Sequence, residues 1–180
     1  MSSPWRVPYV NFAAQWAEEG DHIRAQVESV FGRGDFIGGG AVAEFEAKAA
    51  AYCDTEHAVA LNSGTDALIL SMRALGIGPG DEVITPPNSF VASTSAVVHV
   101  GATPVFADVQ ADQNIDPAAI SRAITPKTKA IMPVHLTGRV AEMGEIMALA
   151  NEHGLHVIED AAQSIGSLYD GWKAGSLGTV

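Results

Sequence analysis

The sequence predicts an α/β fold with a mostly parallel sheet and helices on both of its faces. Two observations support this prediction. From residue 57 onward, short apolar runs of strand length alternate with longer segments of helical periodicity. A glycine-rich turn over residues 76–81 separates one such helix from the strand that follows it. Because parallel strands need a crossover between them, usually a helix, this alternation favours a parallel sheet.

The N-terminal part of the chain is predicted to be helical. Apolar residues near helical spacing indicate a helix over residues 13–31, and two glycine-containing breaks separate it from a second helix over 41–52. We assign residues 1–55 to an N-terminal helical segment that packs on the large domain. Residues 56–180 are assigned to the large domain itself.

The alternating elements of the large domain follow in order. Strands are expected at residues 57–61, 82–85, 103–107, 129–134 and 155–158. Helices are expected at residues 65–75, 89–99, 117–123 and 140–153. Residues 174–180 resemble the start of a further strand with no helix to cover it. We therefore expect the chain to be truncated inside its fold.

Composition and charge exclude several classes of protein. Of the 180 residues, 47% are hydrophobic and 17% charged, which is typical of a soluble globular domain. A single cysteine, Cys53, excludes an internal disulfide, and residues 1–6 lack an apolar signal region, so a cytoplasmic protein is expected. The net charge of −11 argues against nucleic acid as a partner, and no apolar run reaches membrane-spanning length. The histidines show no metal-ligand spacing, and His135, at a strand end, is more simply structural than catalytic.

The most informative stretch is Val-Ile-Glu-Asp-Ala-Ala-Gln-Ser at residues 157–164. An apolar strand ends at Ile158, Asp160 follows within two residues, and Gln163 comes a turn later. Ligands of open α/β sheets bind outside the carboxyl ends of the strands. A carboxylate there suits a protonated heterocyclic nitrogen such as that of pyridoxal phosphate (PLP), whose protonated ring is the better electron sink. The alternative is that Asp160 is only a helix N-cap.

Two more stretches are expected at the same edge of the sheet. Gly64, Thr65 and Asp66 lie where a strand leads into a helix, and free backbone N–H groups there can hold a phosphate. Phe90 follows the strand that ends at Thr85, and its ring can stack on a flat cofactor. Each has an ordinary alternative, because Ser-Gly-Thr-Asp is a common N-cap sequence and Phe90 also suits the core side of a first helical turn.

Four stretches share their order and spacing with a known family: residues 36–46, 62–68, 80–93 and 133–164. Together they resemble the N-terminal part of the DegT/StrS family of PLP-dependent sugar aminotransferases, which have the aspartate-aminotransferase fold (fold type I). The resemblance runs from Asn11 to Val180. It implies the PLP-transferase large domain, cut before the C-terminal small domain.

The resemblance implies roles for the matching positions. The phosphate of PLP would be held by Gly64, Thr65 and Asp66, the pyridine ring would stack on Phe90, the ring nitrogen would pair with Asp160, and the phenolic oxygen would lie near Gln163. Family members are typically homodimers with active sites at the interface. They transfer an amino group, usually from glutamate, to a keto sugar attached to a nucleotide.

The lysines of the chain depart from the family pattern. The Schiff-base lysine of the family would lie shortly beyond Val180, and the four lysines present, at positions 48, 127, 129 and 173, do not fit it. This chain alone is therefore expected to be inactive in transamination.

Three alternatives to the aminotransferase remain. Relatives with histidine in place of the lysine are pyridoxamine-phosphate-dependent sugar dehydratases, and the position that decides between the two is absent. A non-catalytic PLP-fold binding protein is the second alternative. A dinucleotide-binding oxidoreductase is disfavoured, since no G-x-G-x-x-G fingerprint follows the first predicted strand.

Overall fold

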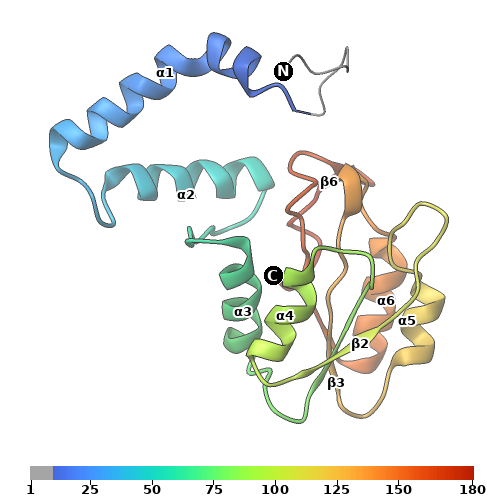
Figure 1. Ribbon diagram of the computed structural model, residues 1–180. Helices are drawn as coiled ribbons and strands as arrows, with labels where there is room; N and C mark the ends of the chain where they lie inside the picture. Colours follow the sequence, from blue (N-terminus) through green and yellow to red (C-terminus); the bar gives the residue numbers. More distant parts are fainter. Residues whose placement is uncertain (1–9) are drawn as a thin grey trace, which may run out of the picture. The chain divides into compact units, whose positions relative to one another are not determined.

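The computed structural model describes residues 10–180. Residues 1–6, in which no signal region is expected, therefore lie outside the described residues. The chain divides into two compact units, one ending at Phe45 and the other comprising Glu46–Val180. The boundary falls inside helix α2 (Gly40–Cys53), and Figure 1 labels the elements in chain order.

The first unit is helical, as predicted. Helix α1 (Phe12–Arg33) begins where the side chain of Asn11 accepts a hydrogen bond from the backbone N–H of Ala14, at 3.2 Å. It ends at Gly34, whose positive φ of 72° suits a residue without Cβ. Both predicted helices are confirmed with slightly longer bounds.

The second unit contains a four-stranded parallel sheet in the order β2-β1-β3-β4. Its strands are β1 (Glu82–Thr85), β2 (Thr103–Phe106), β3 (Thr128–Ile131) and β4 (His156–Val157). Its helices are α3 (Gly64–Ala74), α4 (Val91–His99), α5 (Pro117–Ala123) and α6 (Met143–His153). A 3-10 turn, η1 (Leu136–Gly138), and an antiparallel hairpin of β5 (Leu168–Tyr169) and β6 (Trp172–Lys173) complete the unit.

Helices cover both faces of this sheet, which confirms the predicted fold class. One apolar cluster joins α3 and α4 to strand residues such as Val83 and Ala130. The other joins α5 and α6 to strand residues such as Ile84 and Ile131. Neighbouring strand residues thus belong to opposite clusters, because successive side chains of a strand point to opposite faces. Figure 1 shows the two helix pairs on either side of the strands.

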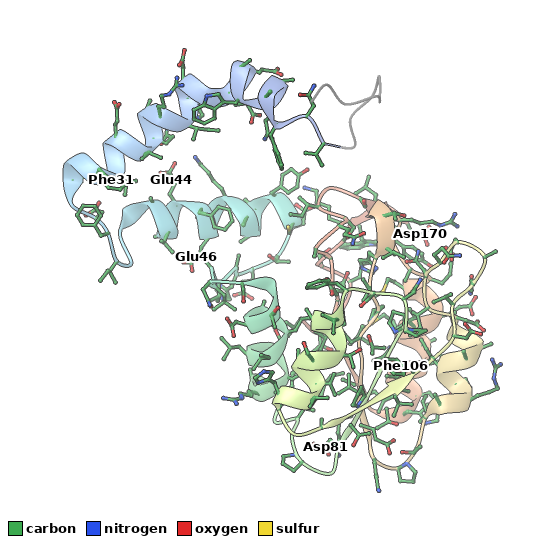
Figure 2. All side chains as sticks on the ribbon, in the orientation of Figure 1. Phe31, Glu44, Glu46, Asp81, Phe106 and Asp170 are labelled. Carbon is green, nitrogen blue, oxygen red and sulfur yellow. The ribbon has the colours of Figure 1, made fainter. Side chains whose placement is uncertain are left out.

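The N-termini of α3 and α4 both lie at the carboxyl edge of the sheet. Helix α3 ends close to the start of β1, across a turn in which Asp81 accepts a hydrogen bond from the backbone N–H of Gly78 at 3.0 Å (Figure 2). Helix α3 therefore runs opposite to β1, and its first residues lie beyond the strand's carboxyl end. Helix α4 starts shortly after β1 ends. The fold thus brings both helix N-termini to the edge where ligands bind in such sheets.

Two predicted strands differ in the structure. Residues 57–61 pair with no strand of the described residues, and the backbone N–H of Ala60 donates instead to the side chain of Glu46, at 2.8 Å. This prediction was wrong because an apolar run makes a strand only where a neighbouring strand can complete its hydrogen bonds. Residues 174–180 likewise form no assigned strand. Their last two residues nevertheless hydrogen-bond to the backbone of Val157 and Glu159, along the outer side of β4.

Candidate functional site

Asp160 lies at the carboxyl edge of the sheet, on the face covered by α3 and α4. An isolated parallel bridge to Val134 keeps the chain extended up to this residue. One carboxylate oxygen accepts a hydrogen bond from the hydroxyl of Ser93 at 3.2 Å, and Ser93 accepts one from Ser89 at 2.6 Å. Ser93 is 1% exposed and lies in the first turn of α4. A relay of two hydroxyls, with Ser93 buried and Ser89 half-buried, therefore holds the Asp160 carboxylate.

The other oxygen of Asp160 bears on the alternative role as a helix cap. It accepts a hydrogen bond from the backbone N–H of Ala162 at 3.3 Å, as an aspartate does at the start of a turn. The residues after Asp160 form turns and no helix. Asp160 therefore stabilises a turn with one oxygen and contacts α4 with the other, and it is not a helix N-cap.

Phe90 lies directly before α4, and its side chain points into open space. The residue is 73% exposed, which excludes the alternative that it is a core residue within this chain. The carbonyl of Phe90 accepts a hydrogen bond from the backbone N–H of Ser93, at 3.1 Å. The exposed ring is thus tied through the backbone to the residue that holds Asp160.

The start of α3 is arranged in part as expected. A Cβ added at Gly64 would meet nothing within 4 Å, so the space beside this backbone is open. The backbone N–H of Asp66 is not free, however, because it donates to the side chain of Ser63 at 3.1 Å. The hydroxyl of Ser63 in turn donates to the Asp66 carboxylate at 2.9 Å. The N-cap role of this stretch is therefore confirmed, and the backbone donors left for an anion are those of Gly64 and Thr65.

Gln163 lies in the turns after Asp160. Its side-chain oxygen accepts a hydrogen bond from the backbone N–H of Thr137 in η1, at 2.9 Å. This bond orients the amide, because the oxygen has a partner while the NH₂ group remains available as a donor. Gln163 is exposed, so that donor can reach a ligand oxygen.

Thr85 is a candidate site residue that sequence reasoning missed. It ends β1 on the same face as Val83, which belongs to the cluster of α3 and α4. Its hydroxyl oxygen is the one buried side-chain nitrogen or oxygen atom in the described part of the chain that lacks a hydrogen-bond partner. A buried hydroxyl without a hydrogen-bond partner destabilises the folded protein unless a further group, such as a ligand, forms that hydrogen bond. The signal in the sequence was a threonine that ends a strand directly after two apolar residues.

The hydrogen bonds of the site connect only some of the predicted residues. They join Asp160 to the start of α4, and therefore to Phe90. Gln163 is joined to η1, and Asp66 to Ser63. The predicted residues thus share one edge of the sheet, but no direct hydrogen bond joins Asp160, Phe90, Gln163 and the start of α3 to one another. This arrangement suits a flat ligand that would lie between them.

Two titratable residues behind this edge form a buried pair. Nε2 of His135 lies 3.0 Å from the carboxylate of Glu159, and the two side chains are 0% and 1% exposed. Burial alone would raise the pKa of Glu159, but hydrogen bonds from His135 and from the backbone of Gly175, Gly178 and Leu177 outweigh it and leave the pKa below its ordinary value. The structural role expected of His135 agrees with this buried, fully bonded position.

The lysines of the chain lie away from Asp160 or have other partners. Lys127 and Lys129 are exposed at the start of β3, at the opposite edge of the sheet. Lys173 forms an ion pair with Asp54 at 3.3 Å, and its ammonium group lies 4.8 Å from the ring centre of Tyr52. Lys173 is thus a half-buried residue with structural partners.

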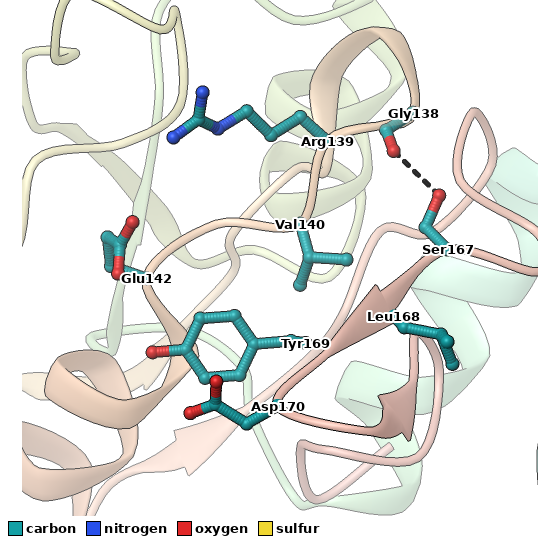
Figure 3. Close-up of a pocket in the computed structure, with 8 residues that line it drawn as sticks. All are labelled: Gly138, Arg139, Val140, Glu142, Ser167, Leu168, Tyr169 and Asp170. Carbon is teal, nitrogen blue, oxygen red and sulfur yellow. Dashed lines mark hydrogen bonds between the residues drawn. The ribbon is translucent and has the colours of Figure 1, made fainter.

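A shallow pocket of about 530 Å³ lies elsewhere, between η1 and the β5–β6 hairpin. Figure 3 shows its lining, including Arg139, Tyr169 and the hydrogen bond from Ser167 to the carbonyl of Gly138, 2.6 Å long. None of the sequence-predicted site residues lines this pocket. Within residues 10–180, no group of three or more side chains has the make-up of a metal site, and no helix of that range is long and apolar enough to span a membrane.

Comparison with known proteins identifies relatives of this chain. The chain is 46% identical over 176 residues to dTDP-3-amino-3,4,6-trideoxy-alpha-D-glucose transaminase of Streptomyces venezuelae, covering 97% of this chain and 46% of the relative. It is 47% identical over 182 residues to UDP-N-acetyl-3-dehydro-alpha-D-glucosamine 3-aminotransferase of Acidithiobacillus ferrooxidans, covering 100% of this chain and 49% of the relative. The chain thus spans about half the length of these relatives.

Solved structures show the same fold. The crystal structure of DesV from S. venezuelae, in complex with a ketimine intermediate, matches with a TM-score of 0.92 at 46% identity over 94% of this chain and 46% of that protein. The structure of NtdA from Bacillus subtilis, with bound cofactor PMP, matches with a TM-score of 0.80 at 42% identity over 83% of this chain and 34% of that protein.

The family model for the DegT/DnrJ/EryC1/StrS aminotransferases matches residues 17–180, which is most of the chain. This match covers every residue from which the candidate site is built. The chain therefore belongs to the DegT/DnrJ/EryC1/StrS aminotransferase family.

Proposed function

We propose that this chain is the cofactor-binding part of a PLP-dependent aminotransferase that moves an amino group, from glutamate, to a keto sugar linked to a nucleotide. Membership of the family supports the reaction class. The two relatives described above, both named as transaminases of nucleotide-linked amino sugars, support the substrate class. In its whole length the protein would supply the cofactor-binding lysine and the small domain that the chain lacks.

The residues at the carboxyl edge fit PLP. The open backbone at Gly64 and the N–H of Thr65 would receive the phosphate, with the helix dipole of α3 favouring its charge. The exposed ring of Phe90 would cover one face of the pyridine. The side-chain oxygen of Gln163 is bonded to the N–H of Thr137, which orients the amide. Its NH₂ group would then donate to the phenolic oxygen.

The observation that carries the proposal is the placement of Asp160. Its carboxylate is held by the Ser93 hydroxyl beside the exposed Phe90, where it can keep a pyridine nitrogen protonated. Bound PLP would supply an electron sink for the bond-breaking step. A carboxylate that keeps the ring nitrogen protonated, as Asp160 would, makes the ring a stronger electron acceptor. A relay of Ser89 and Ser93 holds the carboxylate in one orientation and shields it from water on the side of α4.

The direct experiment uses the full-length protein. Purified protein with PLP is incubated with glutamate and a panel of nucleotide-linked 3-keto and 4-keto sugars, and the amino sugar is identified by mass spectrometry. We expect stoichiometric formation of 2-oxoglutarate and amino sugar. Loss of water from the sugar without amino transfer would identify the pyridoxamine-phosphate-dependent dehydratase. PLP binding with neither reaction would identify a non-catalytic binding protein.

We further propose that the full-length protein is a cytoplasmic homodimer. The single free cysteine, Cys53, suits a reducing compartment. Several large apolar side chains are exposed in the isolated chain, among them Phe45 and Trp172, and such surface is commonly covered by another subunit or domain. Sedimentation equilibrium of the full-length holoprotein tests this proposal, and a monomer at micromolar concentration would contradict it.

A further inference from the structure

Glu159, the neighbour of Asp160, is a buried carboxylate with no part in the roles proposed above. Its side chain is 1% exposed. One oxygen accepts hydrogen bonds from the backbone N–H groups of Leu177, at 2.6 Å, and Gly178. The other accepts from the backbone N–H of Gly175 at 2.9 Å and lies 3.0 Å from Nε2 of His135. Four donors from two separate segments thus converge on one side chain.

The protonation of His135 follows from its second contact. Nδ1 of His135 accepts a hydrogen bond from the backbone N–H of Ala141 at 3.2 Å. The ring proton is therefore on Nε2, which donates it to Glu159. Glu159 then receives four N–H donors and lies opposite no acceptor, so only an ionised carboxylate satisfies this site. The lowered pKa of Glu159, described above, agrees with that state.

The segment bound by Glu159 is closely docked. A Cβ at Gly178 would lie 2.8 Å from the backbone oxygen of Val157, closer than real contacts allow. The backbone N–H groups of Thr179 and Val180 donate to that same oxygen, and the N–H of Glu159 donates to the carbonyl of Val180 at 2.8 Å. Residues 174–180 are thus held on the outer side of β4 by both the backbone and the carboxylate of this strand end.

The same strand end holds Asp160. The backbone N–H of His135 donates to the carbonyl of Asp160, and the N–H of Asp160 donates to the carbonyl of Pro133, both at 3.0 Å. Successive side chains of the extended chain point to opposite faces, so Glu159 faces α5 and α6 while Asp160 faces the candidate site. Glu159 and Asp160 are therefore linked both through His135 and through the shared backbone.

We propose that Glu159 is a positioning residue, which together with His135 docks residues 174–180 on the strand end and thereby orients Asp160 toward the cofactor. This inference rests on the proposed function for its catalytic consequence. Its structural part, the docking, is independent of the cofactor.

The test compares Glu159→Gln with Glu152→Gln in the full-length protein. Glutamine has one acceptor oxygen and an NH₂ group, so two of the four donors would face another donor in either orientation. Glu152 is exposed in α6 and receives the same chemical change. Two readouts are used: amide hydrogen exchange of the apo protein, and the pH at which the absorbance of bound cofactor changes.

We expect Glu159→Gln to raise exchange at Gly175, Leu177 and Gly178 by about tenfold or more over the control, with core amides of α3 and α4 unchanged. The pH of the absorbance change should also shift, because a displaced Asp160 holds the ring proton less firmly. Glu152→Gln should leave both readouts at the wild-type values.

Wild-type exchange at the three amides, or a rise spread evenly over the core, would overturn the docking role. Faster local exchange with an unshifted absorbance would overturn the positioning of Asp160. Should Glu159→Gln fail to fold, His135→Gln, which leaves the three backbone donors in place, decides the matter by the same two readouts. If the wild-type protein binds no PLP, the proposed function fails, while the exchange experiment still tests the docking.

Discussion

Two adjacent carboxylates do different work because the extended chain sends them to opposite faces of the sheet. Asp160 contacts Ser93 of α4 on one face, and Glu159 contacts His135 on the other. Asp160 is partly accessible, as its proposed contact with a ligand requires, whereas the side chain of Glu159 is fully buried. At the residue scale, the chemistry of the site therefore depends on strand alternation as much as on the identity of the side chains.

The replacement Asp160→Asn tests the pairing with the ring nitrogen. In the full-length protein we expect kcat to fall by on the order of 100-fold or more with the fold retained, because asparagine cannot stabilise a protonated pyridine nitrogen. Steady-state kinetics and circular dichroism measure the two quantities. Asp170→Asn is the matched control, since Asp170 is exposed in the β5–β6 turn (Figure 2). Equal turnover in the two variants would remove Asp160 from the mechanism.

The low pKa of Glu159 predicts how stability depends on pH. Its folded-state pKa lies below the ordinary value of 4.5, so its ionisation contributes stability above that pH, and the contribution is lost as the pH falls toward the folded-state pKa. We expect the free energy of unfolding of the wild type to decline on acidification below pH 4.5, and this part of the decline to be absent in Glu159→Gln. Urea unfolding over a pH series measures both, and parallel curves would contradict the prediction.

At the scale of elements, the candidate site depends on where helix α3 begins and where strand β4 ends. Helix α3 begins at Ser63, whose hydroxyl caps the N–H of Asp66 and leaves the open backbone of Gly64 ahead of it. Strand β4 is short, and its outer side is completed by Thr179 and Val180 rather than by a regular strand. These two ends define the carboxyl edge, so changes that move them should affect the site without touching a ligand.

The replacement Gly178→Ala tests the docked segment at this scale. The added Cβ would lie 2.8 Å from the oxygen of Val157, so we expect a loss of about 1–3 kcal/mol in the free energy of unfolding. Gly78→Ala is the control, because its Cβ would meet the backbone of Val100 at an ordinary 3.7 Å. Urea unfolding compares the two. If the Gly178→Ala protein were as stable as the control, residues 174–180 would not be closely docked and the prediction would be contradicted.

At the scale of the whole molecule, the chain spans about half the length of its relatives, and we propose that it carries one side of a cofactor site without the lysine that would bind the cofactor. Its lysines lie at the opposite edge of the sheet or, like Lys173, are engaged elsewhere. Large side chains such as Phe90 and Ile165 are exposed, at 73% and 76%. We expect the full-length protein to be more soluble than the 180-residue chain, because the rest of the protein would cover exposed apolar side chains. We also expect only the full-length protein to bind the cofactor covalently.

Borohydride reduction tests this difference. We expect the 180-residue chain, incubated with PLP and reduced, to carry no lysine-specific adduct that glutamate prevents, whereas the full-length protein should carry one at a single lysine. Peptide mapping by mass spectrometry locates the adduct. Free PLP also modifies exposed amines, so Lys127 and Lys129 serve as internal controls. A single adduct at Lys173 that glutamate abolishes would show that the chain supplies its own lysine.

The sequence by itself determined the helices and four of the six strands that it predicted, and it led to the prediction of a site at the carboxyl edge. These follow from local periodicity and from the rule that parallel strands present their ends together. The strand predicted over residues 57–61 does not form, because a strand needs a neighbouring strand to pair with, and an apolar run does not specify that neighbour.

Only the tertiary structure decided which residues support Asp160. Ser93 lies 67 positions away in the chain, and the donors to Glu159 lie 16 to 24 positions away, so no local pattern could reveal them. Such contacts exist only when the sheet brings separate segments to one edge.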